Sequence, residues 1–144
     1  MIIDRLKDIR EDKDLTQKEI AKILNITQPT YSAFENGTKI IPLKHLNTLC
    51  NYYDVSLDYI LNLSNERKTT NNITILDKNK IGKNIRQVRL ENNLTLRNLA
   101  QELKTTHSTI NAYELGKTLI LTAFAYQICK KYNVSLDWLC GRTK

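Results

Sequence analysis

The sequence predicts an all-α fold with two tandem domains of five short helices each, joined by a polar linker. Two observations predict this fold. Apolar residues recur at the three- and four-residue spacing of amphipathic helices along most of the chain. The chain also repeats itself without a gap, because adding 79 to a residue number in the first half gives its counterpart in the second. Val55-Ser56-Leu57-Asp58, for example, returns as Val134-Ser135-Leu136-Asp137.

Two copies favour two compact domains over a solenoid, which needs about three or more repeats. We therefore expect the first domain at residues 1–64, the linker at 65–80 and the second domain at 81–144. The linker begins with polar residues, and we expect this start to be flexible. Its short apolar patch, residues 73–76, is expected to dock on a domain; the alternative is pairing with the same patch of another chain.

Taken in order, the first helix carries Leu6 and Ile9 and should end near Lys13. The next two helices are predicted at residues 16–24 and 28–36, where they form a helix-turn-helix. The residues expected to face the core of this motif are Ile20, Ala21, Leu24, Tyr31 and Phe34.

Capping chemistry supports both helices of the motif. Thr16 should cap the first one, with Glu19 three residues later completing a capping box. Asn25 lies at the turn, where a left-handed backbone suits asparagine. Thr27 should cap the second helix, which is expected to end at Gly37.

A fourth helix and a short fifth one complete the domain. Ser56 should cap the fifth helix. Their apolar stripes consist of Leu43, Leu46, Leu49, Cys50 and Tyr53 in the fourth helix and of Leu57, Ile60 and Leu61 in the fifth.

The second copy departs from the first around its own motif. Lys104 stands at the turn, and Leu96 replaces Gln17 near the start of the corresponding helix. We expect Leu96 to be exposed. Because Asn98 stands where Glu19 completes the first capping box, we expect the box to be lost in the second copy.

The formal net charge of +7 is concentrated in the second half of the chain. Residues 1–64 carry 8 basic and 9 acidic groups, whereas residues 81–144 carry 10 and 4. A basic balance favours a polyanionic partner. No apolar run approaches membrane-spanning length and the N-terminus lacks a signal-peptide pattern, so we expect a cytoplasmic protein without a membrane partner.

Neither metal nor catalytic chemistry is indicated. The three cysteines have no close spacing, which argues against a metal site or a disulfide framework. We find no glycine-rich phosphate loop and no nucleophile with a base at a known motif spacing. We therefore expect no enzymatic activity, no cofactor, no metal and no small-molecule effector.

The stretch from Leu15 to Gly37, LTQKEIAKILNITQPTYSAFENG, resembles the phage-repressor (Cro/Xre-like, lambda-repressor-like) helix-turn-helix family. The likeness continues through Thr38-Lys39 to Val55-Ser56-Leu57-Asp58-Tyr59-Ile60-Leu61, and the repeat extends it to the second copy. The resemblance implies sequence-specific binding of double-stranded DNA, with the second helix of the motif in the major groove. The alternative interpretation is an αα-hairpin in an ordinary helical bundle.

In this family the amino end of the motif's second helix meets base edges. The amino end of the motif's first helix and the loop that follows the motif touch phosphates. The resemblance therefore implies groove contacts by Thr27, Gln28, Pro29, Thr30, Ser32 and Ala33, and phosphate contacts by Gln17, Thr38 and Lys39. In the second copy the implied groove contacts are Thr106, His107, Ser108, Thr109, Asn111 and Ala112, and the phosphate contacts are Arg97 and Lys117. Gln28 and Asn111 suit adenine.

The resemblance also implies an ion pair that links the first helix to the third. The matching residues are Arg10 with Glu35 in the first copy and Arg89 with Glu114 in the second. The alternative is two independent surface charges in each copy.

The leading hypothesis is a bacterial or phage transcriptional repressor that occupies operator DNA with two readers in one chain. The sequence leaves open whether the protein forms a homodimer or binds a regulatory protein partner. The alternative is an antitoxin or antirepressor-like module in which only one copy binds DNA, with Leu96 and residues 73–76 as apolar contacts to a protein. A third hypothesis, general nucleoid binding by charge alone, predicts no sequence preference.

Overall fold

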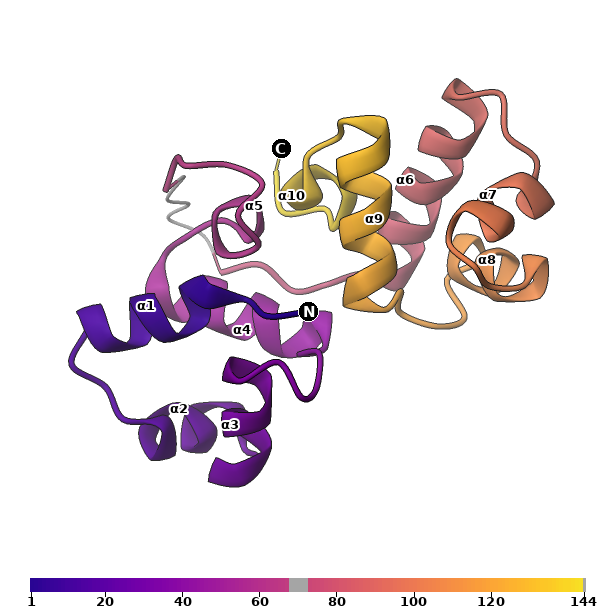
Figure 1. Ribbon diagram of the computed structural model, residues 1–144. Helices are drawn as coiled ribbons and strands as arrows, with labels where there is room; N and C mark the ends of the chain where they lie inside the picture. Colours follow the sequence, from indigo (N-terminus) through magenta and orange to yellow (C-terminus); the bar gives the residue numbers. More distant parts are fainter. Residues whose placement is uncertain (68–72, 144) are drawn as a thin grey trace. The chain divides into compact units, whose positions relative to one another are not determined.

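The structure, a computed structural model, describes residues 1–67 and 73–143 (Figure 1). The chain divides into two compact units, Met1–Ile73 and Thr74–Lys144, which we call the first and the second unit. All regular secondary structure of the described residues is helical, so the predicted all-α fold is confirmed. No helix in this part of the chain is both long enough and apolar enough to cross a membrane.

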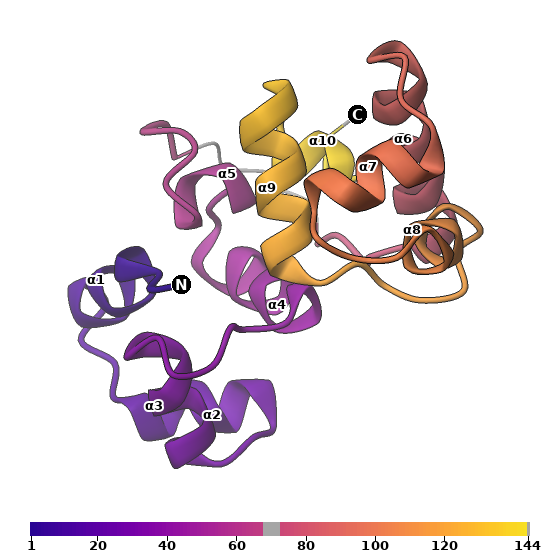
Figure 2. The same ribbon diagram turned by 45° about the vertical axis from the view of Figure 1, so that its right-hand side comes forward.

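The first unit has the five predicted helices. They are α1 (Asp4–Asp12), α2 (Gln17–Leu24), α3 (Gln28–Glu35), α4 (Leu43–Tyr53) and α5 (Leu57–Ile60). Each helix contributes a fully buried side chain to one core, namely Leu6, Ile20, Tyr31, Leu46 and Leu57. Helices α2 and α3 pack against each other and α1 contacts α3, an arrangement that Figures 1 and 2 show from two sides.

The second unit repeats this arrangement. Its helices are α6 (Lys78–Glu91), α7 (Leu96–Glu102), α8 (His107–Glu114), α9 (Thr122–Tyr132) and α10 (Leu136–Leu139). Helix α6 begins inside the range expected for the linker, because the Asp77 side chain caps it by accepting hydrogen bonds from the backbone N–H groups of Asn79 and Lys80. Residues 78–80 therefore belong to a helix.

The start of the expected linker is held on the first unit. Arg5 Nη1 donates to the carbonyl oxygens of Tyr59 and Ser64, both at 2.7 Å, and Arg5 Nη2 donates to Asn65 Oδ1 at 2.8 Å. Arg67 Nε donates to the Tyr59 hydroxyl at 3.2 Å. These contacts differ from the flexible start that the polar composition predicts, because the Arg5 guanidinium holds the Asn65 side chain and Arg67 reaches back to Tyr59.

The apolar patch at residues 73–76 does not dock as expected. Ile73 and Ile75 are 83% and 87% exposed, while Thr74 and Leu76 between and after them are half-buried. Exposure alternates along this segment, so packing of one side leaves the two isoleucines facing outward. The docking prediction is wrong for these two side chains.

Helix capping reverses two expectations. In the first unit Thr16 Oγ1 accepts the backbone N–H of Glu19 at 3.1 Å, but the Glu19 carboxylate accepts from the Thr16 hydroxyl and not from the Thr16 backbone N–H, so the expected capping box is not completed. In the second unit Thr95 and Asn98 form a reciprocal capping box, with bonds of 3.0 Å in both directions. The prediction that Asn98 loses the box is wrong, because its amide oxygen reaches the Thr95 backbone N–H.

Both turns of the two motifs adopt the left-handed conformation. Asn25 has φ +57°, as predicted, and Lys104 has φ +56°. Asparagine tolerates this region, whereas for lysine it costs about 1 kcal/mol relative to glycine. The changed residue therefore leaves the shape of the second motif in place at a modest cost in stability.

Candidate nucleic-acid interface

Helix α3 has one buried side and one accessible side. Tyr31 and Phe34 are 0% and 5% exposed, and their rings meet edge to face with centroids 6.5 Å apart. Thr27 caps the helix, since its Oγ1 accepts the backbone N–H of Thr30 at 3.3 Å. The accessible side consists of Gln28 and Pro29, which are exposed, and Ser32 and Ala33, which are half-buried.

Arg10 and Glu35 tie α1 to the carboxyl end of α3. Arg10 Nε donates to Glu35 Oε2 at 2.7 Å and Arg10 Nη2 donates to Oε1 at 3.0 Å. Both side chains are buried, with 10% and 4% exposed. Burial is the largest single influence and favours a higher pKa for the Glu35 carboxyl, but the hydrogen bonds that this carboxylate accepts, together with the charge of Arg10, outweigh burial and hold that pKa below its usual value.

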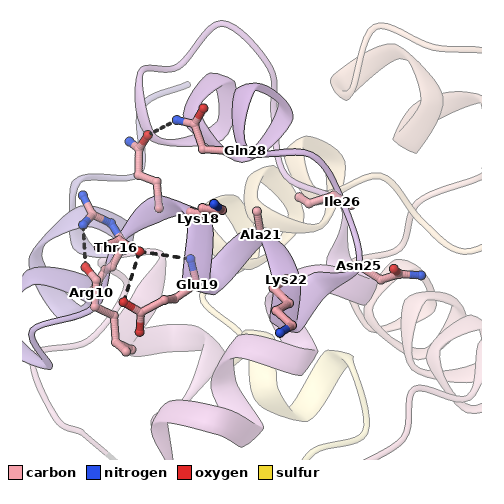
Figure 3. Close-up of a pocket in the computed structure, with 11 residues that line it drawn as sticks. Arg10, Thr16, Lys18, Glu19, Ala21, Lys22, Asn25, Ile26 and Gln28 are labelled. Atoms are coloured by element: carbon pink, nitrogen blue, oxygen red, sulfur yellow. Dashed lines mark hydrogen bonds between the residues drawn. The ribbon is translucent and has the colours of Figure 1, made fainter.

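Gln17 links this ion pair to the accessible side of α3. Gln17 Nε2 donates to Glu35 Oε1 at 3.1 Å, and Gln17 Oε1 accepts from Gln28 Nε2 at 2.7 Å. Figure 3 shows the bond that Gln28 donates. Hydrogen bonds thus run from Arg10 through Glu35 and Gln17 to Gln28, and we call these four residues the relay.

An open hollow lies along α2 beside the relay (Figure 3). Besides Gln17 and Gln28, its lining includes the exposed lysines Lys18 and Lys22. These two cations were not among the residues predicted for the interface. The hollow is also lined by Glu19, and the two lysines add positive charge of the kind that attracts a polyanion such as a DNA backbone.

The loop after α3 carries the remaining candidates of the first unit. Thr38 and Lys39 are exposed. The Thr38 backbone N–H donates to Asn36 Oδ1 at 2.9 Å, and the Lys39 N–H donates to the Ala33 carbonyl at 3.1 Å. Gly37 has φ +82°, which lets the chain turn sharply there. The loop is thereby fixed close to the end of α3.

The second unit places its candidates in the same way. On α8, His107, Ser108 and Asn111 are exposed and Ala112 is half-buried, while the Thr106 cap accepts the Thr109 N–H at 3.2 Å. Arg97 on α7 and Lys117 after α8 are both exposed. Their cationic groups are accessible from solvent, as phosphate contacts require.

The ion pair recurs in the second unit, but the relay does not. Arg89 Nε and Nη2 donate to the Glu114 carboxylate at 2.7 and 2.9 Å. Leu96 and His107 occupy the positions of Gln17 and Gln28, so the amides that continue the relay in the first unit are missing. Leu96 is half-buried, which corrects the expectation that it is exposed.

Sequence reasoning missed the relay, because it assigned Gln17 to a phosphate and Gln28 to a base without considering a bond between them. One signal for it was present. Both glutamines are replaced together in the second copy, by Leu96 and His107. Paired replacement in two otherwise similar copies is what a direct side-chain contact would produce.

Comparison with known proteins identifies both halves of the chain. A family model described as helix-turn-helix matches residues 6–60, and a second, described as a helix-turn-helix domain, matches residues 82–142. The chain is 44% identical over 61 residues to YqaE of Bacillus subtilis (strain 168), an uncharacterized HTH-type transcriptional regulator. This match covers 42% of the chain and 53% of YqaE.

Two further relatives have different roles. The phage CTXphi transcriptional repressor RstR of Vibrio cholerae is 32% identical over 57 residues, covering 40% of the chain and 51% of RstR. Antitoxin PezA of Streptococcus pneumoniae serotype 4 is 36% identical over 56 residues, covering 39% of the chain and 35% of PezA. The chain thus spans about half the length of YqaE and RstR and a smaller part of PezA.

Proposed function

Because this chain belongs to the helix-turn-helix family, which matches it in both halves, we propose that it is a DNA-binding transcriptional regulator with one reader in each unit. We further propose that it acts as a repressor by covering operator DNA and excluding polymerase. The observation that carries the proposal is the accessible side of α3, which presents Gln28, Pro29, Ser32 and Ala33 while its opposite side is buried.

In this proposal α3 enters the major groove of double-stranded DNA with its amino end toward the bases. Gln28 reads a base edge, with adenine as the partner that its amide matches in two hydrogen bonds. Pro29 and Ala33 offer apolar contact to a thymine methyl, and the short hydroxyls of Thr27, Thr30 and Ser32 donate to nearby acceptors. Gln17, Thr38 and Lys39 lie at positions suited to phosphates, and Lys18 and Lys22 add charge beside them.

The second reader works with a different balance of contacts. Asn111 has the amide that suits adenine, and His107 and Ser108 precede it on the exposed side of α8. Arg97 and Lys117 supply charge for phosphates. Since residues 81–144 hold 10 of the basic groups and only 4 of the acidic ones, this unit contributes most of the sequence-independent affinity.

Selection of bound duplexes from a random pool, with the mass of the protein in solution measured alongside, tests the proposal. We expect one or two enriched motifs, each lost when the exposed side of its reader is replaced by alanines. A pool without enrichment would contradict sequence-specific reading and would instead support binding by charge alone. The mass distinguishes two readers in one chain from a homodimer.

The similarity to antitoxin PezA and the exposed Ile73 and Ile75 favour a second candidate function. In this version only one unit binds DNA and the chain also holds a protein partner against residues 73–76. The same selection separates the two, because a single motif that needs α3 but not α8 is the result expected from the second candidate.

A further inference from the structure

The segment that follows α5 is held by a guanidinium from the first helix of the unit. Arg5 on α1 lies with its guanidinium carbon 4.2 Å from the centroid of the Tyr59 ring. Its Nη1 donates to the carbonyl oxygens of Tyr59 and Ser64, both at 2.7 Å, and its Nη2 donates to Asn65 Oδ1 at 2.8 Å. One side chain therefore ties α1 both to α5 and to the chain beyond it.

A second guanidinium holds the chain two residues further on. Arg67 Nε donates to the Tyr59 hydroxyl at 3.2 Å, and the guanidinium carbon of Arg67 lies 5.1 Å from the centroid of the same ring. Arg67 Nη2 also lies 3.8 Å from Asp12 Oδ2 at the end of α1. We call Arg5, Tyr59 and Arg67 the clamp. Because both arginines reach one ring, the clamp holds the chain on the first unit as far as residue 67.

The backbone holds the chain as far as Ser64. The N–H groups of Leu63 and Ser64 both donate to the Asp58 carbonyl oxygen, at 2.8 and 3.1 Å. Beyond Ser64, the contacts that reach back to α1 and α5 come from the side chains of Asn65 and Arg67. Opening the clamp would therefore move the last anchor of the first unit from residue 67 back to residue 64.

The second unit indicates which of these contacts the fold itself requires. Asn84 stands at the position of Arg5, and its Nδ2 donates to the carbonyl oxygens of Trp138 and Leu139 at 2.9 and 3.2 Å. Since Trp138 is the counterpart of Tyr59, both units tie their first helix to their fifth, and an asparagine is enough for this tie. The longer side chain of Arg5 adds the bonds to residues 64 and 65, which act on the connecting chain.

The clamp shortens the stretch between the last anchor of the first unit and the first anchor of the second. Asp77 caps α6, so ten residue steps lie between Arg67 and Asp77, and they span at most about 33–36 Å. Thirteen steps lie between Ser64 and Asp77, and they span at most about 43–47 Å. The difference of about 10 Å corresponds to about three base pairs, because about ten base pairs of DNA rise by about 34 Å.

We propose that Arg5 and Arg67 are positioning residues for two-site binding, which set the largest separation of half-sites that one chain bridges. This proposal rests on the proposed function, since it requires both units to engage one DNA. The effective concentration of a tethered unit falls toward zero when the tether cannot span the two sites. Holding the chain at residue 67 therefore excludes duplexes whose half-sites lie only a few base pairs too far apart. The clamp adds selectivity for spacing to the base preferences of the two readers.

The double variant Arg5→Asn with Arg67→Gln opens the clamp with little disturbance of the fold. Arg5→Asn introduces the residue that the second unit carries at this position, and Arg67→Gln alters a side chain that is 48% exposed. The probes are the selected duplex and a series of duplexes in which its two half-sites are moved apart by one base pair at a time. Wild type and variant are titrated on the same duplexes, so the rotation of one half-site around the DNA axis is the same for both.

We expect the largest bridged spacing to increase by about three base pairs in the double variant. At the first spacing that the wild-type chain does not bridge, the variant should bind about ten-fold more tightly than the wild type. A role of the clamp in the fold alone would not move this limit, because the readers and the DNA are unchanged.

Lys7→Asn with Lys13→Gln is the matched control, because it removes two positive charges from exposed positions of the same unit outside the clamp. It should weaken binding by a similar factor at every spacing and leave the largest bridged spacing unchanged. If circular dichroism shows that the variant with Arg5→Asn does not fold, Arg67→Gln alone decides the question. That variant moves the last anchor back to Asn65 and should increase the largest bridged spacing by about two base pairs.

Cleavage after Glu66 by a glutamate-specific protease tests the clamp without DNA. Glu66 is exposed and lies between the contacts of Asn65 and Arg67 with the clamp. Because a protease requires a locally released chain, opening the clamp should increase the rate of this cleavage by about ten-fold, as followed by mass spectrometry. The lysine control should be cleaved at the wild-type rate.

The outcomes separate the inference from the function on which it rests. If the variant is cleaved faster after Glu66 but bridges the same spacings as the wild type, the clamp holds the chain without setting the spacing, and the inference is wrong. If neither the cleavage rate nor the largest spacing changes, the clamp does not hold the chain and the inference is wrong as well. If the affinity of the wild-type chain does not depend on spacing at all, only one unit binds, and the proposed pair of readers fails together with the inference.

Discussion

Arg10 and Glu35 form a two-bonded ion pair that joins α1 to the end of α3, and Arg89 and Glu114 repeat it between α6 and α8. Arg10 also donates from Nη1 to the Leu15 carbonyl at 2.8 Å, so a single guanidinium fixes the loop between α1 and α2 as well. The pair thereby holds the helix-turn-helix at a set angle to the rest of its unit.

Arg10→Met should therefore destabilise the first unit by about 3–5 kcal/mol, because it leaves the carboxylate of Glu35 buried without its partner. Urea unfolding monitored by circular dichroism measures the effect. Lys7→Met is the matched control, since Lys7 pairs with Glu11 on the surface and its side chain is 60% exposed; its cost should stay below about 1 kcal/mol. An unchanged denaturant midpoint for Arg10→Met would show that the pair contributes nothing to the fold.

Acid should weaken the first unit through Glu35. Because the folded-state pKa of this carboxyl lies below its usual value, its contribution to stability is present above the unfolded-state pKa of about 4.3 and is lost as the pH falls through the folded-state pKa. Unfolding curves measured from pH 7 downward should show the free energy of unfolding beginning to fall at about pH 5. The double variant Arg10→Met with Glu35→Leu removes the pair and serves as the control. If that variant loses stability in acid to the same extent, the acid response belongs to other groups.

Gly82→Ala should destabilise the second unit specifically. A Cβ atom at Gly82 would lie 2.4 Å from the Tyr113 carbonyl oxygen and 2.6 Å from that of Glu114, so α6 and α8 would have to separate. Such overpacking costs about 1–3 kcal/mol. Lys83→Ala, at an exposed neighbouring position of α6, is the control and should change little. Normal stability of Gly82→Ala would mean that the two helices tolerate a wider spacing.

Cleavage of the chain between the units should weaken specific binding sharply. Arg67 contacts the first unit and Asp77 caps α6, so the ten residue steps between them reach at most about 33–36 Å. Two recognition helices that bind one DNA turn apart must lie about 34 Å from each other. The connecting chain joins the ends of the units and not these helices, so the length that it must span can differ from this spacing. Once one unit is bound to DNA, the tether gives the other unit an effective concentration of about 1 mM at the neighbouring site.

A protease site placed between residues 67 and 73 allows this measurement on one sample before and after cleavage. Circular dichroism should stay unchanged while the affinity for the selected duplex falls. Equal affinity in the intact and the cleaved chain would indicate that a single unit binds.

Much of the fold could be predicted from the sequence, because short amphipathic helices with Thr and Ser caps leave clear periodic signals and the repeat supplies each signal twice. Pairing of Arg10 with Glu35 was inferred from the family resemblance and from its recurrence as Arg89 with Glu114. The hydrogen bonds that the sequence does not predict depend on how far individual side chains reach. The sequence pattern does not show that the shorter Asn98 side chain can complete a capping box as Glu19 would, or that Arg5 reaches Tyr59 and Asn65 across the unit.

The interface was predicted as a set of residues but not as a connected network. Residue type places Gln28 on the accessible side of α3, yet only its distance from Gln17 shows how the amide is oriented. The exposure of Ile73 and Ile75 was also missed, since an alternating apolar pattern predicts one packed side without telling which residues occupy it.

Although each unit has a reader, the first unit should contribute most of the base discrimination and the second most of the charge-driven affinity. Binding titrations at several salt concentrations, on the selected duplex and on a scrambled one, test it most directly. Gln28→Ala should relax preference at one or two base pairs and cost about 1–3 kcal/mol on the selected duplex alone. Lys117→Ala or Arg97→Ala should weaken both duplexes alike and reduce the slope of log affinity against log salt by about one. Equal losses on both duplexes for Gln28→Ala, or an unchanged salt slope for Lys117→Ala, would contradict this division between the units.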